Sequence, residues 1–86
     1  MKEIDDLSWV VRGKQRREII PHLSGPINPT ALAKRSGYSL NHTSRVLNDF
    51  RKKGLVKLLN PKEKTGRLYE LSPKGKKVKD QLLASQ

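Results

Sequence analysis

The stretch that decides the fold runs from residue 28 to residue 53 and reads NPTALAKRSGYSLNHTSRVLNDFRKK. Asn28 followed by Pro29 is a helix start signal, because the Asn side chain can accept a hydrogen bond from a free helix amide and proline loses nothing at the first helical position. Gly37 is a typical helix end, and Ser39 can cap a second helix that runs to the end of the stretch. The pattern predicts a helix-turn-helix, although such a corner also occurs in unrelated small domains.

The residues after this stretch favour a β-hairpin followed by a helix. Residues 55–59 (LVKLL) and 67–71 (RLYEL) are short apolar-rich runs, and the connection between them is polar and contains glycine. Ser72-Pro73 repeats the cap-and-proline signal and begins a last helix. A hairpin that directly follows a helix-turn-helix is the layout of a winged helix.

Two further helices are expected before the helix-turn-helix. Ile4, Leu7 and Val11 recur at helical spacing, with Trp9 and Val10 beside them, and predict a first helix. Residues 14–23 predict a second helix, which Pro21 should kink or end early.

The whole chain is therefore expected to be mainly α with a small β-hairpin (α+β), a winged helix-turn-helix. We expect one DNA-binding domain over residues 1–86, with the helix-turn-helix at 28–53, the wing at 55–71 and the C-terminal helix at 73–84.

Charge is the strongest compositional signal. The 86 residues carry a formal net charge of +11. Residues 1–50 hold 8 basic and 5 acidic side chains, whereas residues 51–86 hold 11 basic and 3 acidic ones. A small body with this charge implies a polyanionic partner, with nucleic acid the first candidate, an acidic membrane face the second and an acidic protein the third.

Several classes of protein are disfavoured by what the sequence lacks. There is no cysteine, which excludes disulfides, thiolate metal sites and cysteine nucleophiles. No apolar run approaches a membrane span, and the first residues do not form a secretory signal. No phosphate-cradling glycine loop or nucleophile elbow is present. We therefore expect no enzyme, no cofactor, no metal, no membrane association and no small-molecule ligand, in a cytoplasmic protein associated with the nucleoid.

Residues 9–78, about four-fifths of the chain, resemble the small archaeal winged-helix regulators of the MarR-like and ArsR-like superfamily. The matching stretches are RGKQRREII at 12–20, NPTALAK at 28–34, TSRVL at 43–47, KGLV at 53–56 and GRLYELSPKG at 66–75. The resemblance implies a winged helix-turn-helix that binds duplex DNA, commonly as a dimer. Pro21 departs from the family pattern, and the missing cysteines remove the thiolate metal site of the arsenic-sensing branch.

The second helix of the helix-turn-helix is expected to enter the major groove with its polar side. That side lies opposite the apolar stripe of Thr43, Leu47 and Phe50. Arginine can pair with guanine and asparagine with adenine, although polar residues of this kind also occur on solvated helix faces. The candidate DNA contacts on or beside this helix are Ser39, Leu40, Asn41, His42, Ser44, Arg45 and Asn48.

Further candidates flank this helix. Thr30, near the start of the preceding helix, can face a phosphate or simply serve as a surface residue. Lys62, Lys64 and Arg67 on the wing can reach a minor groove or its phosphates, or only keep a loop soluble. Arg67 could instead pair with Glu70 or Asp49.

The basic start of the second predicted helix has two possible explanations. Lys14, Arg16 and Arg17 oppose the helix dipole there, so they either bind phosphate or pair with nearby carboxylates. Those carboxylates are Asp5, Asp6 and Glu18.

Dimerisation is expected through the first and last helices. The candidate contacts are Leu7, Trp9, Val78, Leu82 and Leu83, all of which could instead pack within one chain.

Three functions fit these features. The first is a sequence-specific double-stranded DNA-binding transcriptional regulator. The second is a low-specificity DNA-coating chromatin protein, and the third is a winged-helix protein-protein module of a transcription assembly.

Overall fold

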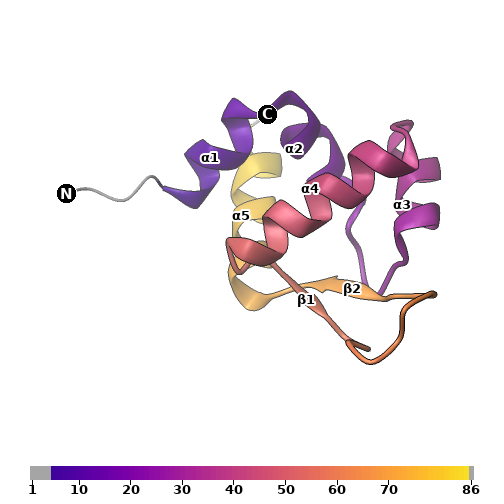
Figure 1. Ribbon diagram of the computed structural model, residues 1–86. Helices are drawn as coiled ribbons and strands as arrows, with labels where there is room; N and C mark the ends of the chain where they lie inside the picture. Colours follow the sequence, from indigo (N-terminus) through magenta and orange to yellow (C-terminus); the bar gives the residue numbers. More distant parts are fainter. Residues whose placement is uncertain (1–4, 86) are drawn as a thin grey trace.

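Five α-helices, a short 3-10 helix and a two-stranded antiparallel sheet make up residues 5–85, the part of the chain that the computed structural model describes (Figure 1). The elements are α1 (Asp6–Arg12), α2 (Lys14–Ile19), the 3-10 helix η1 (Ile20–His22), α3 (Pro29–Ser36), α4 (Leu40–Lys52), β1 (Val56–Leu58), β2 (Tyr69–Leu71) and α5 (Pro73–Ala84). This mainly helical chain with one small hairpin confirms the predicted fold class.

Local signals set the bounds of the helix-turn-helix. The Asn28 side chain accepts a hydrogen bond from the amide of Ala31 at 2.8 Å, and α3 begins at the next residue. Gly37 ends α3 with a left-handed φ of 81°, which glycine adopts without steric cost. The Ser39 hydroxyl oxygen accepts a hydrogen bond from the amide of His42 and so caps α4. These capping roles agree with the sequence prediction.

Pro21 ends α2 early, as predicted. The α-helical part stops at Ile19, and the chain continues as the 3-10 helix η1 around the proline. Proline has no amide hydrogen to donate, so the regular α-helical hydrogen-bond pattern cannot continue there. Ile19 and Ile20 nevertheless both reach the core and are fully buried.

The core lies between α4 and the helices around it. Four side chains of α4 are buried: Thr43, Val46, Leu47 and Phe50. Val46, Leu47 and Phe50 belong to one hydrophobic cluster with Ile19 and Ile20, with Leu55 at the start of the wing, and with Val78 and Leu82 of α5. Because one side of α4 is committed to the core, its opposite side is free to face outward.

The first predicted helix is present as α1, and it buries Val10 rather than Val11. Val10 is fully buried, whereas Val11 is 40% exposed. Positions three and four residues after Leu7 both fit one helix face, so periodicity alone does not choose between them. Leu7 is partly buried against the core, and Ile4 lies outside the described residues.

The wing is a short hairpin with a long tip. Val56 pairs with Leu71 and Leu58 with Tyr69, so each strand has three residues rather than the five predicted. Ile27 adds an isolated bridge to Tyr69, which joins the turn before α3 to the wing. The wing therefore has a fixed position beside the helix-turn-helix.

The wing tip is closed by side-chain bonds to the backbone. The Asn60 side chain donates to the carbonyl of Gly66 at 3.0 Å and accepts from the amide of Leu68 at 2.7 Å. These two bonds hold the ends of the tip together.

Candidate nucleic-acid interface

The outward side of α4 presents a row of polar side chains. Opposite the buried residues lie Asn41, His42, Ser44, Arg45 and Asn48, all exposed. Within residues 5–85, the side chains of Asn41, Arg45 and Asn48 make no hydrogen bond or ion pair. Their hydrogen-bonding groups are therefore available to a partner.

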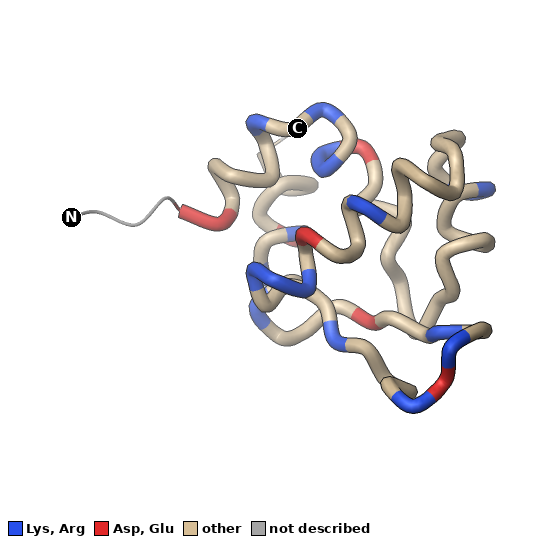
Figure 2. Tube along the Cα trace, viewed as in Figure 1, with Lys and Arg blue, Asp and Glu red and all other residues tan. Residues whose placement is uncertain are grey.

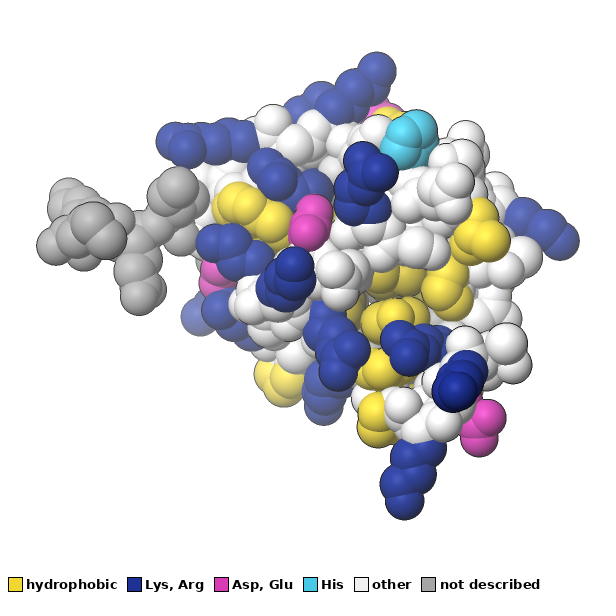
Figure 3. All heavy atoms as spheres, viewed as in Figure 1, with side chains coloured by type: hydrophobic (Ala, Val, Ile, Leu, Met, Phe, Trp, Pro, Cys, Tyr) yellow, Lys and Arg dark blue, Asp and Glu magenta, His cyan; other side chains and the backbone are white. Residues whose placement is uncertain are grey.

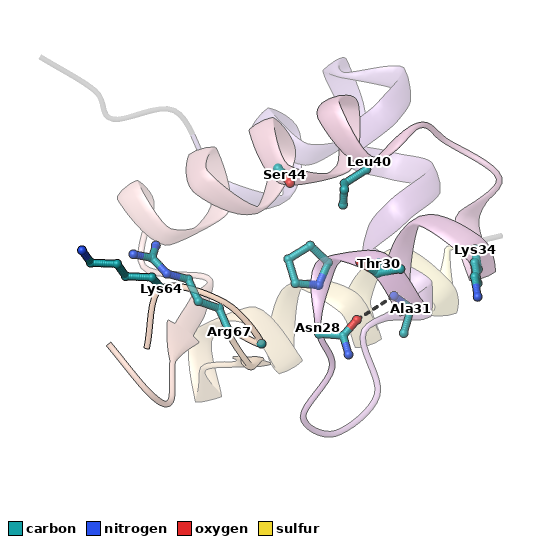
Figure 4. Close-up of a pocket in the computed structure, with 10 residues that line it drawn as sticks. Asn28, Thr30, Ala31, Lys34, Leu40, Ser44, Lys64 and Arg67 are labelled. Atoms are coloured by element: carbon teal, nitrogen blue, oxygen red, sulfur yellow. Dashed lines mark hydrogen bonds between the residues drawn. The ribbon is translucent and has the colours of Figure 1, made fainter. Parts of the chain in front are cut away.

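A cleft separates the N-terminal halves of α3 and α4 from the wing. It has a volume of about 500 Å³, and its lining includes Thr30, Leu40, Ser44, Lys64 and Arg67. Leu40 and Ser44 point into it from α4, facing Thr30 of α3 (Figure 4). The sequence-predicted residues of three separate elements thus line one cavity.

Arg67 is partly used within the wing. Its Nε donates a hydrogen bond to the carbonyl of Glu63 at 3.1 Å. It forms no ion pair with Glu70 or Asp49 within the described residues, so those suggested pairings are wrong. Lys62 and Lys64 are exposed at the tip.

The remaining predicted residues have mixed roles. Ser39 is exposed, but its hydroxyl oxygen is occupied as the α4 cap. Leu40 is 49% exposed at the first position of α4, beside the cleft. An apolar side chain at this place can contact a thymine methyl group or only cover the helix start.

The basic residues at the start of α2 do not pair with the predicted carboxylates. The Arg16 guanidinium carbon lies 4.2 Å from the centroid of the Trp9 ring, and Arg17 donates to the carbonyl of Val11 at 2.8 Å. Asp6 instead pairs with Lys74 of α5 at 3.1 Å, the ion pair found within residues 5–85. Sequence spacing could not reveal these partners, because they depend on how α1, α2 and α5 pack.

Tyr38 connects the turn before α4 to α2. Its hydroxyl donates a hydrogen bond to the Glu18 carboxylate, and its ring lies edge-on to the ring of His42. The hydrogen bond to Glu18 is the main cause that raises the pKa of Tyr38, followed by desolvation. Tyr38 is a positioning residue that the sequence analysis did not single out.

The predicted dimer contacts divide into two groups. Val78 and Leu82 are 4% exposed and belong to the core of the chain itself, so they are wrong as interface residues. Leu7 and Trp9 are partly buried against the same core. Leu83 is 44% exposed.

Positive charge gathers on the side of the molecule that carries the polar face of α4 and the wing. Lys and Arg residues lie along the wing and along the C-terminal part of α4 (Figure 2). A view onto α4 shows their side chains gathered over both regions, with a hollow between α4 and the wing (Figure 3). The polar face of α4 is thus flanked by cationic groups.

No protein-family model matches the chain, and no curated protein matches it in sequence. Solved structures do match. A MarR family transcription regulator aligns with a TM-score of 0.75 at 21% identity, over 88% of this chain and 54% of that one. The fold is a MarR-type winged helix.

Two further structures align with this winged helix. A cysteine-to-serine mutant of MarR from E. coli, complexed with operator DNA, gives a TM-score of 0.71 at 26% identity, covering 91% of this chain and 58% of that one. NadR in complex with 4-hydroxyphenylacetate gives a TM-score of 0.73 at 23% identity, covering 91% of this chain and 57% of that one. The chain therefore spans little more than half the length of these neighbours.

These neighbours support the MarR-like part of the resemblance seen in the sequence. The archaeal origin and the ArsR-like relationship stay predictions. So does the expected absence of a small-molecule ligand, since NadR was solved with one. Within residues 5–85, no helix has the length and hydrophobicity needed to cross a membrane.

Proposed function

We propose that this chain is a sequence-specific double-stranded DNA-binding transcriptional regulator. The observation that carries the proposal is the row of unpaired polar side chains on α4, of which Asn41, Arg45 and Asn48 are the main members. In this proposal α4 enters the major groove, and the wing meets the adjacent minor groove or its phosphates.

The chemistry of the α4 face supports base reading. An α-helix fits the major groove, where arginine can bond to two acceptors of guanine and asparagine to both groups of adenine. Asn41, Arg45 and Asn48 follow one another at i, i+4 and i+7, so they share one side of the helix. His42 and Ser44 flank this row and can contact bases or phosphates.

The cleft beside α4 supports a phosphate contact. Pro29 has no amide hydrogen, and the Asn28 cap occupies the amide of Ala31, so the Thr30 amide and hydroxyl are the groups left at the start of α3. A helix N-terminus favours an anion, and Lys64 and Arg67 face the same cleft. Ser39 and Leu40 adjoin this contact at the start of α4.

The wing supports a second, sequence-independent contact. Lys62 and Lys64 are exposed at its tip, and positive side chains there are attracted to any duplex. The MarR neighbour complexed with operator DNA, at 26% identity, supports duplex DNA as the partner.

The decisive experiment is selection of bound duplexes from a random pool, followed by competition with unrelated duplex. Recovery of a defined motif that unrelated duplex cannot displace would support the regulator. Binding that unrelated duplex displaces equally well would favour the low-specificity chromatin protein. An absence of duplex binding would favour the protein-protein module.

We also propose that the chain binds DNA as a homodimer through α1 and α5. The large hydrophobic residues exposed on these helices are Val11 and Leu83. Analytical ultracentrifugation of the chain with Leu83→Glu should then show a shift from dimer to monomer. A palindromic selected motif would support the same symmetry.

A further inference from the structure

A second basic pocket lies at the other end of α4 from the cleft. It has a volume of about 430 Å³ and is lined by Trp9, Arg16, Asp49, Lys52 and Lys53. The Arg16 guanidinium carbon lies 4.2 Å from the Trp9 ring centroid, and the Lys53 ammonium nitrogen lies 5.2 Å from it. Two cations therefore share one aromatic ring.

These cations are not neutralised by the protein. Within residues 5–85, neither Arg16 nor Lys53 has a carboxylate within ion-pair distance, although Asp49 lines the same pocket. The Nε of Arg16 is buried and has no hydrogen-bond partner. Two like charges held close together repel each other, and an anion between them would relieve this repulsion.

The backbone at Gly13 makes room for this arrangement. A Cβ atom at Gly13 would lie 2.3 Å from the Nε of Arg16. Any other residue at position 13 would therefore force the end of the Arg16 side chain to shift. The position of Arg16 therefore depends on a residue that contributes no side chain of its own.

The helix dipole does not account for this cluster. Cations in the last turn of α4, such as Lys52, are favoured by the negative end of that helix. Arg16 is the third of the six residues of α2 and lies in both its first and its last turn, so the dipole of this short helix neither favours nor opposes its charge. Its place beside Lys53 needs a different explanation.

The pocket continues the polar row of α4. Lys52 follows Asn41, Arg45 and Asn48 at helical spacing, four residues after the last of them. From Ser44, which lines the cleft, to Lys53 the helix rises about 13 Å. The cleft and the second pocket therefore lie toward opposite ends of α4.

We propose that the pocket of Trp9, Arg16 and Lys53 binds a phosphodiester group of duplex DNA, at the end of α4 away from the cleft. This inference rests on the proposed placement of α4 in the major groove. The cleft and this pocket would then fix both ends of α4 against the phosphate backbone, and the contact would be independent of base sequence.

Trp9 is the single tryptophan of the chain, so its fluorescence reports on this pocket directly. Titration with a short mixed-sequence duplex should change the Trp9 emission. In the chain carrying Arg16→Gln and Lys53→Gln, we expect about tenfold weaker binding to every duplex. The slope of log affinity against log salt should fall in magnitude by about 0.9, the contribution of one lost phosphate contact.

Matched variants separate this contact from charge and folding effects. Lys76→Gln with Lys77→Gln removes the same charge from exposed positions on α5 and should leave most of the affinity and slope. Arg16→Lys with Lys53→Arg should restore binding. Gly13→Ala keeps every charge, yet it should weaken binding because it displaces Arg16. Thermal unfolding checks that each variant is folded.

Each outcome decides the question. Equal losses in the Arg16/Lys53 and Lys76/Lys77 variants would overturn the phosphate contact and leave the regulator proposal in place, as would an unchanged Trp9 emission on duplex binding. A specific loss without any sequence preference would support the contact and count against the regulator. No duplex binding by the unaltered chain would overturn both.

Discussion

The Tyr38 hydroxyl donates a hydrogen bond to the carboxylate of Glu18, a residue twenty positions earlier in the chain. The bond ties the turn that precedes α4 to α2. Because the ring of Tyr38 also lies against His42, the contact orients the N-terminal end of the candidate DNA-reading helix.

This contact predicts a pH effect. The hydrogen bond to Glu18 holds the pKa of Tyr38 above its ordinary value. Folding therefore favours the protonated phenol of Tyr38. The contact stabilises the folded chain fully below the ordinary tyrosine pKa of about 10, and this stabilisation is lost as pH rises through the raised pKa. A pH titration followed by the difference in ultraviolet absorbance between the unaltered chain and Tyr38→Phe should have its midpoint at this raised pKa. Glu18→Gln should lower it, and an unmoved midpoint would contradict the contact.

Gly75 allows α5 to approach the start of the wing. A Cβ atom there would lie 2.0 Å from the carbonyl oxygen of Leu55. Gly75→Ala should therefore reduce the free energy of unfolding by about 1–3 kcal/mol, as overpacking does, with a lower Tm. Lys77→Ala, at an exposed position of the same helix, should change it by less than about 0.5 kcal/mol. Equal free energies of unfolding for the two variants in denaturant would show that the close approach of α5 does not require glycine at position 75.

Arg45 is expected to read a base. Arg45→Ala should weaken the selected duplex by roughly 1–3 kcal/mol and unrelated duplex much less, because only the selected site offers the matching acceptors. Arg35→Ala removes the same charge from an exposed position in the last turn of α3 and serves as the control. Competition titrations measure the affinity of each variant for the selected and the unrelated duplex. An equal loss on the two duplexes would mean that Arg45 contacts phosphate alone.

The wing is expected to contribute affinity without selectivity. Lys62→Ala with Lys64→Ala should weaken all duplexes alike and lower the magnitude of the salt slope by about 1.8. Asn60→Ala, which removes the two bonds that close the tip, should produce part of the same loss without removing charge. Titrations at several salt concentrations test this. An unchanged slope in the lysine variant would remove the wing from the interface.

Sequence alone determined the ends of the helices and the exposed side of α4. Asn28, Gly37 and Ser39 act on amides and carbonyls within a few residues of themselves, so their effect can be predicted locally. The spacing of Thr43, Leu47 and Phe50 likewise decides which side of α4 faces solvent, because helical periodicity needs no information about neighbours.

Tertiary structure decided which partners the side chains found. The choice of Val10 over Val11, and the placement of Arg16 and Lys53 on one tryptophan ring, depend on how α1, α2 and α4 meet. The sequence places several possible partners within reach of a long cationic side chain, but only the packing of the helices decides which partner it contacts. The pairing is therefore set by contacts between distant segments, which no local pattern contains.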